Sequence, residues 1–209
     1  MNYMLTHSLI TGLISVVLLF PSLAHSKVPP VIMDRYDILN YTDNYGNLHL
    51  RNRYFTSLPN NLVIKRNLNI IGTPLTELPK NLVIGGSLDA SDSALSIVHA
   101  RTKIKGYADF LGSQIVTWPR GIEVGGYLNF TDTPLKSLPT GLVVKGDLSL
   151  MRTPLTTLPN NLRVDGDLFI GGSAISSFPE KMTVKGNIFL GGNTITKWPN
   201  ELNLGGVVY

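Results

Sequence analysis

Four aspartates recur in two pairs whose members lie 20 residues apart, Asp89 with Asp109 and Asp147 with Asp167. Stacked carboxylates can bind Ca²⁺, which takes about six to eight oxygen ligands, or can act as the acid and base of a glycosidase. The nearest other carboxylates in the sequence fall at predicted turns, and no dense run of oxygen ligands surrounds either pair. The sequence therefore favours a solvated surface for these aspartates and predicts no metal site.

Other reactive side chains are scarce. The chain has no cysteine, which excludes disulfides, thiolate metal sites and a cysteine nucleophile. Apart from two histidines near the N-terminus, the only ones are His49 and His99, and neither has the neighbours of a catalytic triad. Glycine pairs such as Gly85-Gly86 belong to a repeat and form no phosphate-binding loop. We therefore expect no catalysis and no cofactor.

The most suggestive surface residues are aromatic. Tyr107 and Tyr127 are 20 residues apart, and so are Phe169 and Phe189. Outward aromatic side chains on neighbouring coils are expected to stack on an exposed sheet face, and exposed apolar clusters of this kind mark binding sites. The alternative is that they only stabilise the sheet as cross-strand pairs. These four residues are the candidate binding site.

A repeat places all of these residues. Its prolines recur every 20 residues, with a gap only at His99: Pro59, Pro79, Pro119, Pro139, Pro159, Pro179 and Pro199. A glycine follows seven residues after each slot, except at Arg66: Gly86, Gly106, Gly126, Gly146, Gly166, Gly186 and Gly206. A fixed period of this length predicts a solenoid in which each coil contacts mainly its two neighbours.

Each repeat reads P-x-x-L-x-V-x-G-x-L-x-L-x-x-T-x-L-x-x-L. From Leu142 to Leu150 apolar and other residues alternate, as they do in strands, and the inward position in the middle is Gly146. A glycine there fits a bend where a side chain would collide with the next coil. We predict two short strands hinged at the glycine. Prolines such as Pro154 favour an extended return path for the second half.

Small polar residues form one column of the repeat: Thr73, Ser93, Ser113, Thr133, Thr153, Ser173 and Asn193. If they point inward at a turn, their side chains can bond the backbone of the adjacent coil and satisfy buried polar groups. The alternative is that they are simple turn residues. We predict the ladder between coils.

Apolar columns on either side of the glycine, and a third after the small polar column, predict a continuous core. A further column varies most in size: Leu58, Leu78, Val98, Trp118, Leu138, Leu158, Phe178 and Trp198. Either the core widens there or the tryptophans lie at its edge. Residues 90–109 are the weakest copy, with Ala90 and Ala108 at apolar slots. Its register survives, so we expect the coil to be wound.

The stretch Leu148 to Pro159 resembles the core of the short bacterial leucine-rich repeat, L-x-V-x-x-N-x-L-x-x-L-P, and eight copies cover roughly residues 46 to 209. The copies depart from it by placing Thr or Ser in the Asn slot, except for Asn193 and Arg53, and L-x-V-x-G upstream. The chain is similar to a leucine-rich-repeat variant, or to a β-solenoid that converges on it. Families with this repeat include secreted effectors of pathogenic bacteria, some with a ubiquitin-ligase domain whose catalytic cysteine this chain lacks.

The N-terminus reads as a signal peptide over residues 1–26. The apolar run Leu9 to Phe20 is too short to span a bilayer and is followed by small residues, so cleavage after Ala24 or after Ser26 fits. No lysine or arginine precedes Lys27, and a retained anchor or a different start are the alternatives. Residues 27–45 do not follow the repeat and are predicted to cap the first coil, and residues 46–209 form the solenoid.

These patterns predict an all-β, single-domain parallel β-solenoid of about eight 20-residue coils. We expect a periplasmic or secreted, non-catalytic binding module for a protein or a surface glycan, with no stable membrane insertion after signal removal. A net charge of +4 is too small to predict nucleic-acid binding. The alternatives are a translocated virulence effector and a carbohydrate-active β-solenoid enzyme. An open edge over residues 202–209 predicts an end-to-end homodimer.

Overall fold

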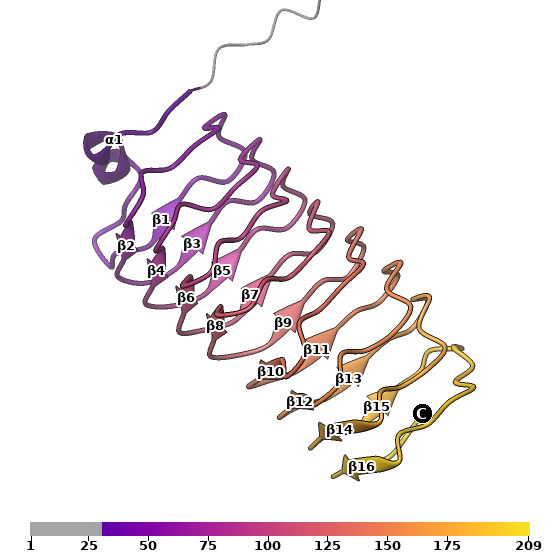
Figure 1. The fold of residues 1–209 in the computed structure, drawn as a ribbon. Helices are drawn as coiled ribbons and strands as arrows, with labels where there is room; N and C mark the ends of the chain where they lie inside the picture. Colours follow the sequence, from indigo (N-terminus) through magenta and orange to yellow (C-terminus); the bar gives the residue numbers. More distant parts are fainter. Residues whose placement is uncertain (1–30) are drawn as a thin grey trace, which may run out of the picture.

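A computed structural model describes residues 31–209, which form a parallel β-solenoid with a single short helix (Figure 1). The predicted fold class is therefore confirmed. The predicted signal peptide, residues 1–26, lies outside the described residues. Between residues 31 and 209, no helix has the length and apolar character needed to cross a membrane.

One side of the solenoid is an eight-stranded parallel sheet, to which nearly every coil contributes one strand. Its strands, in order, are β1 (Leu48–His49), β3 (Leu68–Asn69), β5 (Leu88–Asp89), β7 (Ala108–Asp109), β9 (Leu128–Asn129), β11 (Leu148–Ser149), β13 (Leu168–Phe169) and β15 (Ile188–Phe189). Residues 20 apart are paired throughout, as in Leu148 with Leu168. We call its outward surface the continuous face.

A second side carries two separate four-stranded parallel sheets. The first contains β2 (Val63–Ile64), β4 (Val83–Ile84), β6 (Lys103–Ile104) and β8 (Glu123–Val124). The second contains β10 (Val143–Val144), β12 (Leu162–Val164), β14 (Lys181–Val184) and β16 (Glu201–Leu204). The sheet is interrupted between β8 and β10, so we call the outward surface of this side the divided face.

On the third side, neighbouring coils are joined by isolated parallel β-bridges, such as those between Glu77 and Ile97 and between Thr117 and Ser137. Between the sides the chain turns at a position with positive φ, filled by Asn61 (59°), Asn81 (56°) and Gly141 (75°), among others. Asparagine and glycine tolerate this left-handed conformation at low cost, which explains the turn chemistry of the repeat.

The hinge glycines separate the strands of the two sheets, as predicted. In one coil β10 ends at Val144, Gly146 follows, and β11 begins at Leu148. A Cβ on Gly146 would lie 2.8 Å from the backbone nitrogen of Tyr127, and a Cβ on Gly166 would lie 2.7 Å from the carbonyl carbon of Gly146. The coils of these glycines therefore approach too closely at this corner for a side chain, although the first copy has Arg66 at the position.

The column of small polar residues corrects one prediction. Its first five members are buried and its last two are partly buried. Four of the buried hydroxyls bond within their own coil instead of across coils, and the Ser113 hydroxyl has no partner among the described residues. Thr73 Oγ1 donates to the Ile70 carbonyl (2.9 Å) and Thr153 Oγ1 to the Leu150 carbonyl (2.8 Å), three residues back. This bond closes the turn locally, because a short hydroxyl reaches the carbonyl of its own turn first. Only Asn193 reaches across: its Nδ2 donates to the Ser173 carbonyl at 3.0 Å.

One apolar core runs along the whole axis, and three large rings meet near its middle. Phe110 and Phe130 stack with centroids 5.6 Å apart, and Trp118 meets both rings edge-on at 5.3 and 5.1 Å. The two tryptophans differ: Trp118 is 4% exposed and lies within the core, whereas Trp198, near the C-terminal end, is 43% exposed and lies at its edge.

The weakest copy of the repeat is fully wound. It forms β6 and β7, and its residues Ala90 and Ala108 are completely buried. Phe110 occupies, one coil later, the same column as Ala90. Small residues next to the large ring conserve the core volume, which is what close packing requires.

Before the first full coil lies α1 (Arg35–Asn40), capped by Asp34, whose side chain accepts from the Asp37 amide at 2.8 Å. Met33 is buried in the core, and Ile32 forms a parallel bridge with Ser57. At the other end β16 pairs with β14 on one side, and its other edge meets no strand among residues 31–209.

Candidate functional site

The four predicted aromatic residues lie on the continuous face and form two stacks. The Tyr107 and Tyr127 rings are 4.4 Å apart and nearly parallel, at 7°. Phe169 and Phe189 stack at 4.7 Å and 3°, and Tyr209 extends this second stack at 5.0 Å and 9°. The structure therefore does not bring the four residues into one patch. Sequence reasoning missed Tyr209 as the third ring, although it lies 20 residues after Phe189.

The stacking decides which ring surfaces a ligand can use. Rings packed face to face cover each other's inner surfaces, so a ligand can stack only on the outermost face of each stack. For the tyrosines these are the Tyr107 face toward Ser87 and the Tyr127 face toward the coil of Asp147. For the other stack the Phe169 face points toward Ser149. Two hollows of the continuous face lie at these places.

The first hollow, of about 260 Å³, lies beside Tyr107. Amide, hydroxyl, imidazole and carboxylate groups line it, from Asn47, His49, Asn67, Asn69, Ser87 and Asp89. A ring face surrounded by short polar side chains matches a ligand that has both an apolar face and many hydroxyl groups.

The second hollow, of about 380 Å³, lies between the two stacks. Tyr127 and Phe169 border it, and its polar lining is Asp109, Asn129, Thr131, Asp147 and Ser149.

A hydrogen-bond network holds the polar groups of the second hollow in place. Asn129 Nδ2 donates to Asp109 Oδ1 at 3.0 Å, and the hydroxyls of Thr131 and Ser149 are 2.7 Å apart. Burial and the neighbouring Asp109 charge raise the pKa of Tyr127 well above its ordinary range, so its hydroxyl stays protonated and can donate. The lining is therefore preorganised rather than mobile.

The two sheet sides carry opposite charge. The continuous face has Asp89 and Asp109 in its strands and Asp147 and Asp167 directly before its strands, with no lysine or arginine at these positions. The divided face has the lysine column, Lys65, Lys105, Lys145 and Lys185, in which Asp165 is the acidic member. A ligand of the continuous face is therefore neutral or positively charged, because these carboxylates repel an anion.

A ladder of side chains on the continuous face was missed by sequence reasoning. In six coils the side chain of the residue after the hinge position accepts a hydrogen bond from the backbone amide of the residue one coil later. Asn67 Oδ1 accepts from the Ser87 amide at 2.7 Å, and Asp167 Oδ1 accepts from the Asn187 amide at 2.6 Å. The same bond is made by the side chains of Asn47, Ser87, Asp147 and Asn187.

The sequence contains a signal for this ladder: Asn, Ser or Asp recurs every 20 residues at the position after the hinge. Tyr107 and Tyr127 occupy it in two coils, so the tyrosine stack interrupts the ladder. In these two coils the side-chain bond of the ladder is absent, and an aromatic ring is present in its place.

The other candidate groups form ion pairs. His49 Nε2 lies 3.1 Å from Asp43 Oδ2, and His99 Nε2 lies 3.4 Å from Glu77 Oε2. Asp132 and Arg152 form a bidentate pair at 2.6 Å. Among residues 31–209 no group of three or more histidine, cysteine or carboxylate side chains is arranged to hold a metal ion.

No protein-family model, no curated protein and no solved structure matches this chain. The leucine-rich-repeat resemblance therefore stays a prediction, whereas the coarser statement, stacked parallel coils of 20 residues, is established by the paired register.

Proposed function

We propose that this protein is a non-catalytic binding module that recognises an uncharged glycan through the two hollows of the continuous face. The observation that carries the proposal is the second hollow, where aromatic rings border a preorganised set of carboxylate, amide and hydroxyl groups. Sugar rings have apolar C–H faces that stack on aromatic rings, and hydroxyl edges that bond to such polar groups. The absence of basic residues from the strand positions favours a neutral glycan over an acidic one.

The test is binding of the full chain to a panel of immobilised neutral and acidic oligosaccharides. Tyr127→Ala and Phe169→Ser each remove a ring that borders the second hollow, and we expect each to weaken binding about tenfold or more. Phe189→Ser removes a covered ring and should weaken binding less. Tyr36→Ala is the matched control, because Tyr36 is 81% exposed on α1, away from this face. Preferred binding of acidic oligosaccharides would contradict the proposal.

A protein ligand is the other outcome of this test. If no oligosaccharide binds and a protein from envelope or host-surface extracts is captured, loss of capture in Phe169→Ser and Phe189→Ser identifies the same face as a protein-binding site. If these variants capture the protein as well as the wild type does, the protein does not bind to the continuous face.

The enzyme alternative rests on Asp89 and Asp109, which are paired in register on β5 and β7. Incubation of the chain with each bound oligosaccharide and analysis of the products separates binding from hydrolysis. Intact oligosaccharide supports the binding module. Cleavage that disappears in Asp89→Asn or Asp109→Asn would establish a glycosidase instead.

A periplasmic or secreted location is part of the proposal, because it rests on the apolar N-terminal run and the small residues after it. N-terminal sequencing of the exported protein tests it. A start at His25 or Lys27 supports export through a cleaved signal, whereas an intact N-terminus on protein recovered from host cells favours the effector alternative.

A further inference from the structure

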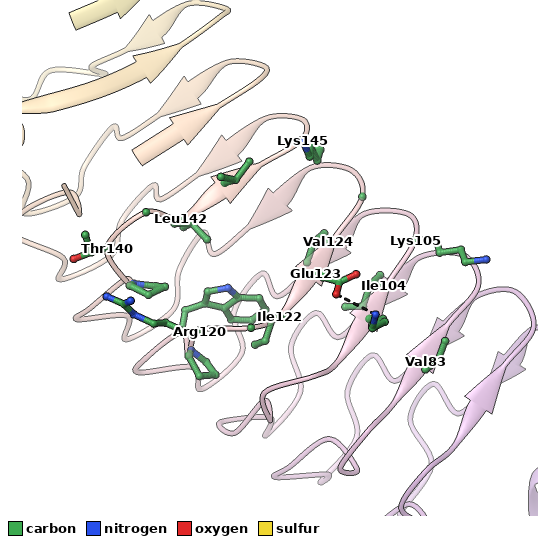
Figure 2. A pocket seen from close by; sticks show the side chains of 18 residues that line it. Val83, Ile104, Lys105, Arg120, Ile122, Glu123, Val124, Thr140, Leu142 and Lys145 are labelled. Carbon is green, nitrogen blue, oxygen red and sulfur yellow. Dashed lines mark ion pairs between the residues drawn. The ribbon is translucent and has the colours of Figure 1, made fainter. Parts of the chain in front are cut away.

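We propose that the break between β8 and β10 on the divided face is a second binding site, which accepts an acidic peptide in extended conformation as an added β-strand. This site is on another side of the solenoid from the two hollows and does not rest on the glycan proposal. Figure 2 shows its lining, with Ile122, Glu123 and Val124 on one side and Leu142 and Lys145 on the other.

The break is local to one side of the coils. On the continuous side β9 and β11 are paired, and the Leu128 amide donates to the Asp147 carbonyl at 2.9 Å. On the bridge side the Lys136 amide donates to the Val116 carbonyl at 2.8 Å. On the divided side the same coils separate, and at the adjoining hinge the Gly146 amide lacks the bond to the Gly126 carbonyl that its equivalents make. The step from β8 to β10 is wider than the steps next to it (Figure 1).

The separation leaves two rows of backbone groups facing each other. In the neighbouring coils the Gly125 amide donates to the Ile104 carbonyl at 2.9 Å, and the Asp165 amide donates to the Val144 carbonyl at 2.9 Å. The corresponding bonds from the Val143 and Lys145 amides to the Ile122 and Val124 carbonyls are not formed. Each edge of a parallel ladder carries both kinds of group, so the β8 edge offers the Ile122 and Val124 carbonyls with the Val124 amide, and the β10 edge offers the Val143 and Lys145 amides with the Val143 carbonyl.

An extended peptide satisfies both edges at once. If it runs parallel to the strands, its amides donate to the Ile122 and Val124 carbonyls, and its carbonyls accept from the Val143 and Lys145 amides. A strand added here would join the two four-stranded sheets into one. Binding of a peptide by strand addition uses an exposed sheet edge, and here two such edges face one another.

The lining determines which side chains the peptide needs. The cavity has a volume of about 960 Å³, and its apolar lining includes Trp118, Ile122, Val124 and Leu142. Ile122 and Val124 are only partly buried, unlike the equivalent Leu82 and Ile84, which are completely buried. Alternate residues of the peptide that face this lining are therefore apolar.

The outward rim of the cavity is basic. Lys105, Arg120 and Lys145 line it, and the single acid of the lining, Glu123, already pairs with Lys103 at 3.1 Å. Among residues 31–209 Lys105 and Arg120 form no ion pair, and Lys145 reaches Asp165 only at 4.0 Å. The remaining residues of the peptide, which point outward, are therefore acidic.

The bulk of the core explains why the break occurs at this coil. Trp118 lines the cavity from inside and packs against Phe110 and Phe130. The equivalents of Trp118 and Phe130 in the next coil are Leu138 and Leu150, both smaller than the rings. The wide core holds β8 and β10 apart on the side where Trp118 lies.

The test uses the full chain and a fluorescein-labelled peptide of about eight residues that alternates glutamate and valine. Two matched probes accompany it: the lysine and valine peptide, and the acidic peptide with N-methyl groups on the amides of one edge. We expect saturable binding of the acidic peptide by fluorescence anisotropy, and binding about tenfold or more weaker for both other probes.

Protein variants locate the site. The double variant Lys105→Glu, Lys145→Glu should weaken binding of the acidic peptide about tenfold or more, and Lys65→Glu, in the same column two coils away, should leave it nearly unchanged. Hydrogen exchange gives a second readout: the Val143 and Lys145 amides should exchange more slowly once the peptide is bound. Circular dichroism of each variant verifies the fold.

Four results would overturn the proposal. They are absence of binding by the acidic peptide, equal binding of the N-methylated peptide, equal losses in Lys65→Glu and the double variant, and unchanged exchange of the Val143 and Lys145 amides. The second and third would mean adsorption to a basic surface without strand pairing.

Discussion

The continuous face and the divided face are built from the same repeat in the same register, yet they differ in three respects. The continuous face is paired from β1 to β15, is acidic at its strand positions, and has its corner closed by a side-chain ladder. The divided face is basic and loses its pairing between β8 and β10. Both faces enclose one core, so a change in core size has to appear on one of them.

The difference shows on which side of the solenoid neighbouring coils can separate. At most hinge glycines the coils are in backbone contact and joined by a bond such as that from the Gly126 amide to the Gly106 carbonyl (2.9 Å), whereas the bond from the Gly146 amide to the Gly126 carbonyl is not formed. The divided side has no comparable contact at β8 and β10, and it opens when the core contains Phe110, Trp118 and Phe130. Variants of the core, the corner and the charges test this comparison.

The largest effect is expected from Phe130→Ala. Phe130 is completely buried between Phe110 and Trp118, so its removal leaves a cavity and should lower the free energy of unfolding by about 3–5 kcal/mol. Denaturant unfolding measures the loss. Phe130→Leu places there the residue that the next coil has at Leu150 and should cost less. A loss below about 1 kcal/mol for Phe130→Ala would mean that the cluster is loosely packed.

The second largest effect is a steric loss of stability at the hinge glycines. Gly166→Ala places a Cβ 2.7 Å from the Gly146 carbonyl carbon, so we expect a loss of about 1–3 kcal/mol in thermal or denaturant unfolding. Gly141→Asn is the control, since Gly141 has φ of 75° and the equivalent turn residues are Asn61, Asn81 and Asn161. If both variants unfold like the wild type, the corner is not tightly closed.

A smaller effect is expected from the side-chain ladder. Asn67→Ala removes the acceptor of the Ser87 amide (2.7 Å) and the donor to Asn47 Oδ1 (2.9 Å), and should cost about 1 kcal/mol. Asn203→Ala is the comparison, because Asn203 is exposed on β16 and forms no side-chain bond among residues 31–209. Equal stability of the two variants would show that water replaces the ladder without loss.

Charge pairing on the divided face should give a modest dependence on pH. Lys185 and then Arg163 donate to Asp165 and hold the pKa of its carboxyl below the ordinary value. The stabilisation is therefore present above about pH 4 and is lost as the pH falls through the lowered pKa of the folded state. Unfolding midpoints measured across this range should fall less steeply for Asp165→Asn. Parallel curves for the two proteins would argue against the pairing.

The smallest effect is expected at the C-terminal end, where end-to-end association through residues 202–209 remains a prediction. The outer edge of β16 meets no strand among the described residues, and Val207 and Tyr209 are 51% and 67% exposed. We expect weak dimerisation in light scattering over a range of concentrations, and Asn203→Lys, at an exposed position of β16, should reduce it by adding charge to the edge. A mass that stays monomeric at all concentrations contradicts this prediction.

The sequence was sufficient for the architecture, because proline and glycine at fixed spacing determine where each coil turns and where it hinges. The stacking of Tyr107 on Tyr127 and of Phe169 on Phe189 also followed from spacing alone. What spacing could not predict is the direction of a hydrogen bond: Thr153 bonds its own coil, and the true ladder lies at Asn67 and its equivalents. The break at β8 also left no insertion in the repeat, because it follows from ring volumes in three dimensions.

The break between β8 and β10 has a consequence for cooperativity. In a solenoid each coil contacts only its two neighbours. The free energy that couples the unfolding of neighbouring coils is therefore smallest at the weakest interface between them. The interface between the coils of Glu123 and Val143 lacks one of its three rows of backbone bonds. We therefore expect the chain to unfold as two cooperative units that share a boundary at this coil, and a ligand that bridges β8 and β10 to merge them into one.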